Sequence, residues 1–144
     1  MRRLLALTVA IVLVGGMITF VRSSLVSAQA KGKTRPLTTS QMMAGLVKPK
    51  YVELKDGLAK ETLGDDDWKA LATHAALLNE SSHMLMADDR CPDKTWEDAS
   101  MILRNASDDA LAALSKKNAD GAAKAFENIS LSCKTCHAEF KYKK

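Results

Sequence analysis

The stretch Cys-Lys-Thr-Cys-His, residues 133–137, lies close to the end of a chain of 144 residues. Two cysteines three positions apart, with a histidine directly after the second, support three kinds of chemistry. They can bind zinc, exchange disulfides, or carry a covalently attached haem. Each chemistry needs different supporting residues, so the rest of the sequence helps to decide among them.

Zinc and thiol exchange are both poorly supported. A closed structural zinc site needs four ligands, usually a second Cys-x-x-Cys or a histidine pair. The chain offers only His74, His83 and Cys91, none at paired spacing. A thiol-exchange pair usually lies at a helix N-terminus, where the helix dipole lowers a thiol pKa. Here the pair falls near the end of the last expected helix, where the dipole has the opposite sign.

Covalent haem fits the motif best. Cys-x-x-Cys-His is the attachment pattern of c-type haem, in which both thiols form thioethers with the porphyrin and the histidine binds the iron. We therefore expect one haem c, held by Cys133 and Cys136, with His137 as an axial ligand. Attachment of this kind takes place outside the cytoplasm, so the motif also predicts an exported protein.

The N-terminus agrees with export. Residues 1–30 begin with two arginines, continue with an apolar run over 4–21 and end in Ala28-Gln29-Ala30, the pattern of a secretory signal peptide. We predict cleavage after Ala30 and a periplasmic or otherwise exported location. The apolar run is also close to spanning length, so an uncleaved anchor is the alternative. Cleavage would leave a nearly neutral domain, without the basic stripe of a nucleic-acid-binding protein.

The remainder is expected to be helical. After a flexible lead-in over 31–37, the chain is rich in helix-forming residues and poor in strand signals. We predict an all-α, haem-binding domain over 38–144, with helices at about 38–62, 66–87, 96–118 and 121–141. Helices of this length joined by short loops favour an up-down-up-down four-helix bundle.

Local signals mark where these helices begin and bend. Capping boxes are predicted for Thr38 with Gln41 and for Thr95 with Asp98. The acidic run 65–67 suits the N-terminus of the second helix. Pro49 should bend the first helix, because its ring crowds the carbonyl four residues before it.

The last helix places the motif on an apolar face. Cys133 and His137 are four residues apart and share one side of the helix. Phe126, Ile129 and Phe140 fall on the same side. We expect these three side chains to form part of a dry wall around the haem.

The sequence resembles a known family at this point. A single haem motif near the C-terminus, on the last helix of an exported all-helical domain, is similar to the class II cytochromes c, the group of cytochrome c-prime and its low-spin relatives. The ending CKTCHAEFK resembles their Cys-x-x-Cys-His-x-x-Phe followed by a basic residue. Lys141 stands where the family often has arginine, which weakens the expectation of a two-pronged contact with a haem propionate.

The resemblance implies that the first helix meets the other side of the iron. A methionine binds there in low-spin members, whereas in cytochrome c-prime proper an apolar side chain crowds an open site. Helical phase places Met43 on an apolar face and Met42 on a mixed, wetter face. We favour Met43 as the second axial ligand. The alternatives are Met42, or two core methionines and a five-coordinate iron.

This choice decides the predicted function. With methionine bound, the iron has a raised potential and no vacant position, so we predict an electron carrier without catalytic residues, serving redox partner proteins. A five-coordinate iron would bind small gases such as nitric oxide instead. A haem peroxidase is the weakest alternative, because no distal histidine or arginine is evident. A homodimer is compatible with the resemblance, and membrane attachment is expected only if residues 1–30 are retained.

Five further residues are expected to lie away from the iron. We predict that His74 is a packed or hydrogen-bonded core histidine and that His83 is exposed. Trp68 and Trp96 should pack in the core near the starts of their helices. Cys91 should be a free thiol, with an intermolecular disulfide between two copies as the alternative.

Overall fold

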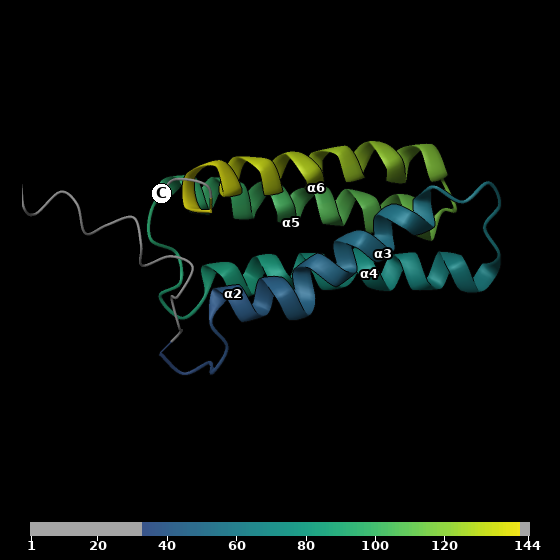
Figure 1. Ribbon diagram of the computed structural model, residues 1–144. Coiled ribbons are helices and arrows are strands. Elements are labelled where there is room, and N and C mark those ends of the chain that lie inside the picture. The colour runs from purple at the N-terminus through teal and green to yellow at the C-terminus, as the bar shows by residue number, and fades with distance from the viewer. Residues whose placement is uncertain (1–32, 142–144) are drawn as a thin grey trace, which may run out of the picture.

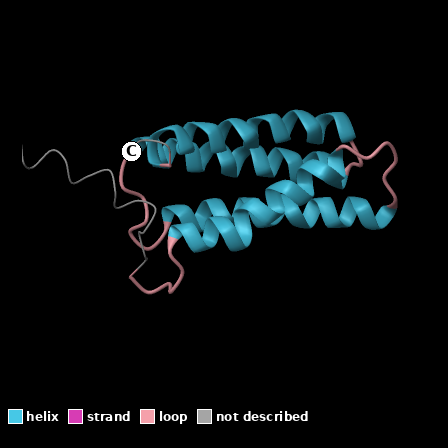
Figure 2. Ribbon diagram, in the orientation of Figure 1, coloured by secondary structure: helices cyan, strands magenta, loops and turns pink. Residues whose placement is uncertain are grey.

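The computed structural model describes residues 33–141, and the predicted signal peptide lies outside this range. The helical segments are α2 (Thr39–Met42), η1 (Met43–Val47), α3 (Lys48–Leu58), α4 (Asp65–Met86), α5 (Lys94–Ser115) and α6 (Ala119–Phe140). The first three are continuous and form one helix, so four helices pack together, with successive helices running in opposite directions (Figure 1). Over the described range every regular element is a helix (Figure 2), which confirms the all-α prediction there.

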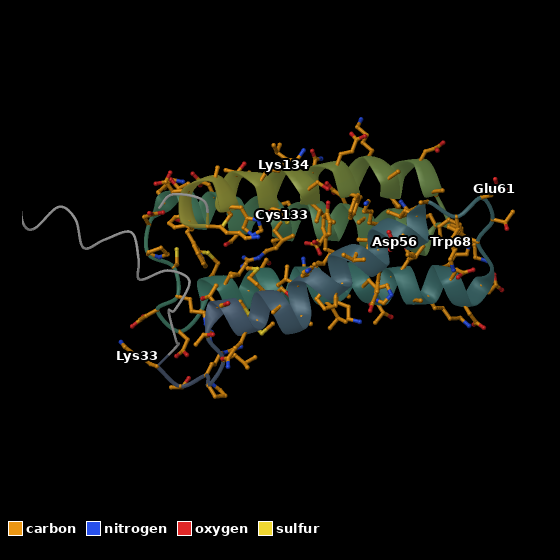
Figure 3. All side chains as sticks on the ribbon, viewed as in Figure 1. Lys33, Asp56, Glu61, Trp68, Cys133 and Lys134 are labelled. Atoms are coloured by element: carbon orange, nitrogen blue, oxygen red, sulfur yellow. The ribbon has the colours of Figure 1, made fainter. Side chains whose placement is uncertain are left out.

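The helices do not contact each other equally. α5 packs along both α4 and α6, and α3 packs on α4, whereas the contact between α3 and α6 is far smaller. Side chains from all four helices fill the core (Figure 3). Each helix contributes a side chain that is at most 1% exposed: Leu54, Leu78, Leu114 and Ile129. Burying a side chain of this size contributes roughly 1.5–3 kcal/mol. None of the described helices is both long and apolar enough to cross a membrane.

The first helix contains a π-helical turn, η1, immediately before Pro49. The backbone N–H of Lys48 donates to the carbonyl of Met43, five residues back, rather than to the carbonyl four residues back. Proline lacks an N–H, and in a regular α-helix its ring would crowd the carbonyl of Gly45. The disturbance predicted at Pro49 therefore takes the form of a wider turn within a continuous helix.

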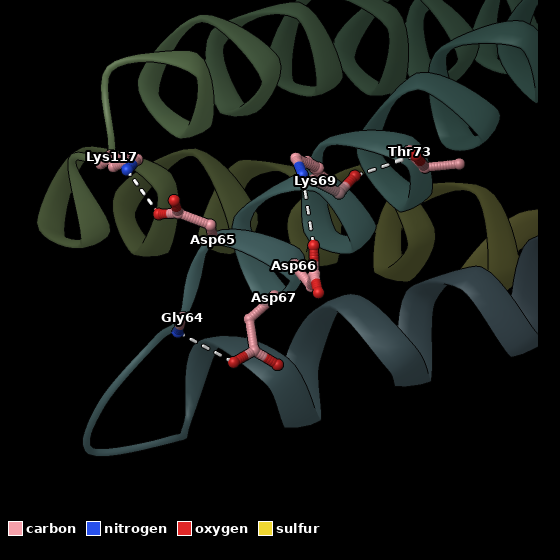
Figure 4. Close-up of polar contacts among 7 residues, drawn as sticks. All are labelled: Gly64, Asp65, Asp66, Asp67, Lys69, Thr73 and Lys117. Atoms are coloured by element: carbon pink, nitrogen blue, oxygen red, sulfur yellow. Dashed lines mark hydrogen bonds and ion pairs between the residues drawn. The ribbon is translucent and has the colours of Figure 1, made fainter.

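Two predicted helix starts are confirmed. At α2, Thr38 Oγ1 accepts from the N–H of Gln41, and Gln41 Oε1 accepts from the N–H of Thr38, which makes a capping box. At α4, the three aspartates of residues 65–67 occupy the first turn. Asp67 accepts from the N–H of Gly64 at 3.0 Å, and Asp65 and Asp66 pair with lysines (Figure 4).

The predicted cap pair Thr95 and Asp98 is wrong. α5 begins at Lys94, and its N-cap is Asp93, whose Oδ1 accepts from the N–H of Trp96 at 3.0 Å. Aspartate caps a helix at least as well as threonine, so the earlier residue takes the position. Asp98 instead pairs with Lys94 one turn before it.

Residues 33–37 lie against the loop between α4 and α5. The N–H groups of Thr34 and Arg35 donate to the carboxylate of Asp88 at 2.9–3.0 Å. Arg90, only 3% exposed, donates through Nη2 to the carbonyl of Leu37 at 2.9 Å. Asp88 and Asp89 both have φ values above 60°, which turns the loop toward this segment. The sequence predicts a flexible lead-in here and gives no sign of these contacts.

Asp88→Asn should loosen this attachment without changing the loop backbone, because asparagine tolerates positive φ but carries no charge. We expect amide hydrogen exchange at Thr34 and Arg35 to become several-fold faster at neutral pH, measured by NMR. Asp89→Asn is the matched control, since Asp89 has the same backbone conformation but pairs only with the exposed Lys33. Equal acceleration in both variants would contradict the assignment.

The difference between wild type and Asp88→Asn should also depend on pH. The N–H donors of Arg35 and Thr34 hold the pKa of Asp88 below its ordinary value of 3.8. A carboxyl whose pKa is lowered by folding stabilises the fold above its unfolded pKa and loses this effect as the pH falls through the folded pKa. Protection in the two proteins should therefore converge only at a pH below 3.8.

Candidate functional site

A cavity of about 620 Å³ opens between the first helix and α6, with α5 behind it. Its size lies within the range of roughly 300–1,000 Å³ that is typical of ligand and cofactor sites. The first helix contributes side chains from α2, η1 and the start of α3, and α6 contributes its last three turns. The sparse contact between α3 and α6 leaves the space for it.

The predicted site residues meet in this cavity. Cys133, Cys136 and His137 line it from α6, and Met43 lines it from η1. Figure 3 shows Cys133 on the side of α6 that faces the other helices. The two elements are far apart in the sequence, and the fold brings them to one space. A π-helical turn such as η1 is often found at a functional site.

The prediction that Met42 lies on the mixed, wetter face of the first helix is wrong. Met42 does not lie on a wetter face: it is 2% exposed and belongs to the core, while Met43 is only partly buried and borders the cavity. The first helix packs against α4 through α3 and η1, and Met42 belongs to the core cluster. A helical wheel drawn from the sequence alone does not show which side a neighbouring helix covers.

The two motif thiols are poorly suited to disulfide exchange. Cys133 and Cys136 are not bonded to each other. Burial raises the pKa of Cys133, and burial together with nearby negative charge raises the pKa of Cys136 to about 11. Both thiols are protonated at neutral pH, whereas a redox-active Cys-x-x-Cys has a lowered thiol pKa. This agrees with the sequence argument against thiol exchange.

His137 is half-buried and lies at the end of α6. Burial, with a smaller contribution from the charge of Lys141, lowers the pKa of His137 below its usual value. A lowered pKa favours the neutral imidazole at neutral pH, and only the neutral ring has a nitrogen lone pair for a metal.

The chain alone does not build a complete metal site. Over residues 33–141, no three His, Cys, Asp or Glu side chains come together as a group that could hold a metal ion. In the cavity, His137 offers an imidazole and Met43 a thioether, beside the two thiols of Cys133 and Cys136.

The apolar wall differs from the prediction. Phe140 lines the cavity as expected, but Phe126 and Ile129 do not. Ile129 is fully buried in the core, and Phe126 packs against Tyr51 with ring centroids 4.9 Å apart. Both residues precede the motif on the same face of α6, where Tyr51 and the core cover that face, whereas the α6 part of the cavity lining begins at Ser130.

Side chains of α5 also form part of the apolar wall, and the sequence did not predict them there. Trp96, Ala99 and Leu103 line the cavity at helical spacing. Trp96 is 2% exposed, its Nε1 donates to the carbonyl of Leu85 at 2.9 Å, and its ring meets Phe140 edge-on at 5.1 Å. The core position predicted for Trp96 is confirmed, and the same ring also forms a wall of the cavity.

Tyr51 is a site residue that sequence reasoning missed. Its hydroxyl lies 3.0 Å from Ser130 Oγ, and Ser130 Oγ itself donates to the carbonyl of Phe126 at 3.0 Å. Because the proton of Ser130 is used in its own helix, Tyr51 is the donor in the contact between them. Both residues line the cavity, so this bond joins α3 to α6 at its edge.

The other singled-out residues lie elsewhere. His83 is exposed, as predicted. The ring of His74 is 19% exposed, and its Nδ1 lies 3.1 Å from Glu53 Oε2, outside hydrogen-bond geometry. Cys91 is a free, partly buried thiol that donates to the carbonyl of Asp93. Trp68 is only partly buried and lines a separate, smaller cleft together with Asp65 and Lys117.

No protein-family model matches this chain, and neither a curated protein nor a solved structure matches it. The chemistry of the cavity is therefore inferred from the residues of this chain.

Removing the bond between Tyr51 and Ser130 should weaken the fold by a measurable amount. We expect Tyr51→Phe and Ser130→Ala each to lower the free energy of unfolding by about 0.5–1.5 kcal/mol in urea titrations. The double variant should lose less than the sum of the two single ones, because both single changes remove the bond between Tyr51 and Ser130. Tyr51→Phe with Thr135→Ala is the control: Thr135 bonds only within α6, so those two effects should add. Additive losses for Tyr51 and Ser130 would refute the proposed coupling.

Proposed function

We propose that this protein is an exported mono-haem cytochrome c that carries electrons between redox partners. Cys133 and Cys136 would hold one haem c, His137 would be one axial ligand and Met43 the other. The observation that carries the proposal is that the Cys-x-x-Cys-His face of α6 and Met43 of η1 line the same cavity. The motif and the methionine lie about ninety positions apart in the sequence, and the motif has a known chemistry.

The residues of the cavity suit this cofactor. Two thiols one turn apart on α6 can hold a large planar group at two points. The lowered pKa of His137 favours the neutral form that binds iron, and Met43 can bring a soft thioether sulfur from the facing helix. Trp96, Leu103 and Phe140 provide apolar surface for the flat faces and exclude water.

When bound, haem iron supplies one-electron chemistry, and the axial ligands set its potential. A methionine ligand favours the reduced iron and leaves no vacant position for a substrate. The hydrogen bond from Tyr51 to Ser130 and the packed helices hold the two ligand-bearing elements at a fixed separation. A site held in this way changes little on oxidation, which suits electron transfer rather than catalysis.

The finer identity of the fold belongs to the same proposal. We infer that the four packed helices form the up-down-up-down bundle of the class II cytochromes c, in the low-spin branch with histidine and methionine ligands. Residues 1–30 would direct the chain to the periplasm or an equivalent exported location. The five-coordinate, gas-binding alternative differs only in whether Met43 reaches the iron, and the spectrum of a Met43 variant distinguishes them.

The covalent attachment is tested by mass and colour. Produced in a host that matures c-type cytochromes, the protein should be red and heavier than its polypeptide by one haem, as measured by intact mass spectrometry. Cys133→Ala with Cys136→Ala should abolish the added mass, because no thioether can form. Cys91→Ala is the matched control and should keep it, since Cys91 does not line the cavity. A colourless wild-type protein with the bare polypeptide mass would refute the proposed function.

The role of Met43 is tested by spectroscopy and potentiometry. Met43→Ala should remove the charge-transfer band of methionine-ligated ferric iron and allow carbon monoxide to bind the ferrous form. Its midpoint potential should fall by about 100 mV or more, within the roughly 0.8 V that axial ligands control. Met42→Leu is the control and should leave the spectrum unchanged, because Met42 packs in the core. Wild-type spectra that already show five-coordinate iron would favour the gas-binding alternative.

A further inference from the structure

Positively charged side chains border the cavity. Lys48 of α3, Lys134 of α6 and Lys141 line it, and all three are exposed. Among the described residues that line the cavity there is no aspartate or glutamate. The opening therefore combines an apolar interior with a cationic border.

Six lysines of residues 33–141 pair with aspartate or glutamate, but Lys48 and Lys134 do not. Their ammonium groups make no ion pair and no hydrogen bond with residues 33–141. The lysines that do pair with aspartate or glutamate are Lys33, Lys50, Lys60, Lys69, Lys94 and Lys117. Charges that are not neutralised locally produce the strongest potential at the surface, and here they border the cavity.

Helix geometry places both lysines beside the same opening. Lys48 is one turn before Tyr51 on α3, and Lys134 is one turn after Ser130 on α6. The two helices run in opposite directions (Figure 1), so both lysines lie on the same side of the bond between Tyr51 and Ser130. On that side they flank the opening that leads to Met43 and His137.

We propose that this opening is the electron-transfer face and that it docks an acidic surface of a redox partner protein. The inference rests on the proposed function and names the chemistry of its partner. Carboxylates on the partner would pair with Lys48 and Lys134, and an apolar patch would cover the opening between them. One electron would pass from the reduced site to the oxidised partner, with no bond formed or broken and no proton moved.

A protein partner fits this surface better than a small anion. A single anion would satisfy the lysines but leave the apolar opening exposed, whereas a protein surface can cover both. An apolar centre with a charged border is the usual arrangement of a transient interface. Border charges of this kind raise the association rate and make it dependent on ionic strength.

The test compares two double variants with the same net charge. Lys48→Gln with Lys134→Gln removes the border cations. Lys116→Gln with Lys124→Gln removes two exposed lysines that make no ion pair and do not line the cavity. Oxidation of the reduced haem protein is followed by stopped flow with hexacyanoferrate(III), an anion, and with tris(phenanthroline)cobalt(III), a cation.

We expect the border variant to react with hexacyanoferrate several-fold more slowly than wild type at low ionic strength, with a weaker dependence on salt. Its rate with the cobalt complex should not fall, and the control variant should resemble wild type in both reactions. Equal effects of the two double variants on the hexacyanoferrate rate would overturn the proposed face.

Binding to an acidic polypeptide gives a readout that does not depend on electron transfer. The border variant should elute from immobilised polyglutamate at lower salt than both wild type and the control variant. Sedimentation with phosphatidylglycerol vesicles tests a membrane instead. Wild type and the control variant could bind the vesicles while the border variant does not. If wild type is at the same time not retained on polyglutamate, the result would overturn the protein partner in favour of a lipid surface. A protein without covalent haem would refute the proposed function separately.

Discussion

The cavity depends on how little the first helix and α6 touch. α5 packs closely on α4 and α6, and α3 packs on α4, so three of the four possible neighbour contacts are extensive. The fourth, between α3 and α6, is small and includes the hydrogen bond from Tyr51 to Ser130. Beyond this contact the two helices leave a space lined by Met43 on one side and by the cysteine-histidine motif on the other. A bundle packed evenly on all four sides would bury these residues against each other and leave no room for a cofactor.

The residues that border this space have few other hydrogen-bonding partners within the chain. Buried serines elsewhere in the helices, such as Ser81 and Ser82, donate to carbonyls of their own helix, and Trp96 donates to Leu85, so the polar groups near the core are largely satisfied internally. The thiols of Cys133 and Cys136 and the thioether of Met43 are weak hydrogen-bonding groups that need no such partner. Sulfur, aromatic and aliphatic groups share the wall with the hydroxyl groups of Thr39, Ser40, Ser100, Ser130 and Ser132. The wall is therefore mixed, and its apolar part would suit the flat faces of the proposed cofactor.

Much of this arrangement could be predicted from the sequence, and the failures have identifiable causes. Period and spacing predict four helices and put Cys133 and His137 on one face, because these signals are local. The burial of Met42, the direction of Phe126 and the bond from Tyr51 depend on which neighbour covers each side of a helix. That is a property of tertiary packing, which a helical wheel does not contain. Asp93 and Thr95 lie two residues apart and are both good N-cap residues, so the sequence does not decide between them. Helix ends are the least determined part of such a prediction.

The distribution of charge over the surface also depends on tertiary packing, whereas the sequence alone gives only the net charge. The sequence predicts a nearly neutral domain after cleavage, and from that number alone no charged surface is expected. In the fold, most of the carboxylates that pair with lysines lie near helix ends or in loops, as in the pairs of Lys60 with Asp67 and Lys117 with Asp65. Lys48 and Lys134 are left beside an opening that has no acid among its lining residues. A net charge near zero thus coexists with a local positive potential, and it is the local potential that a partner meets at distances shorter than the screening length of about 8–10 Å.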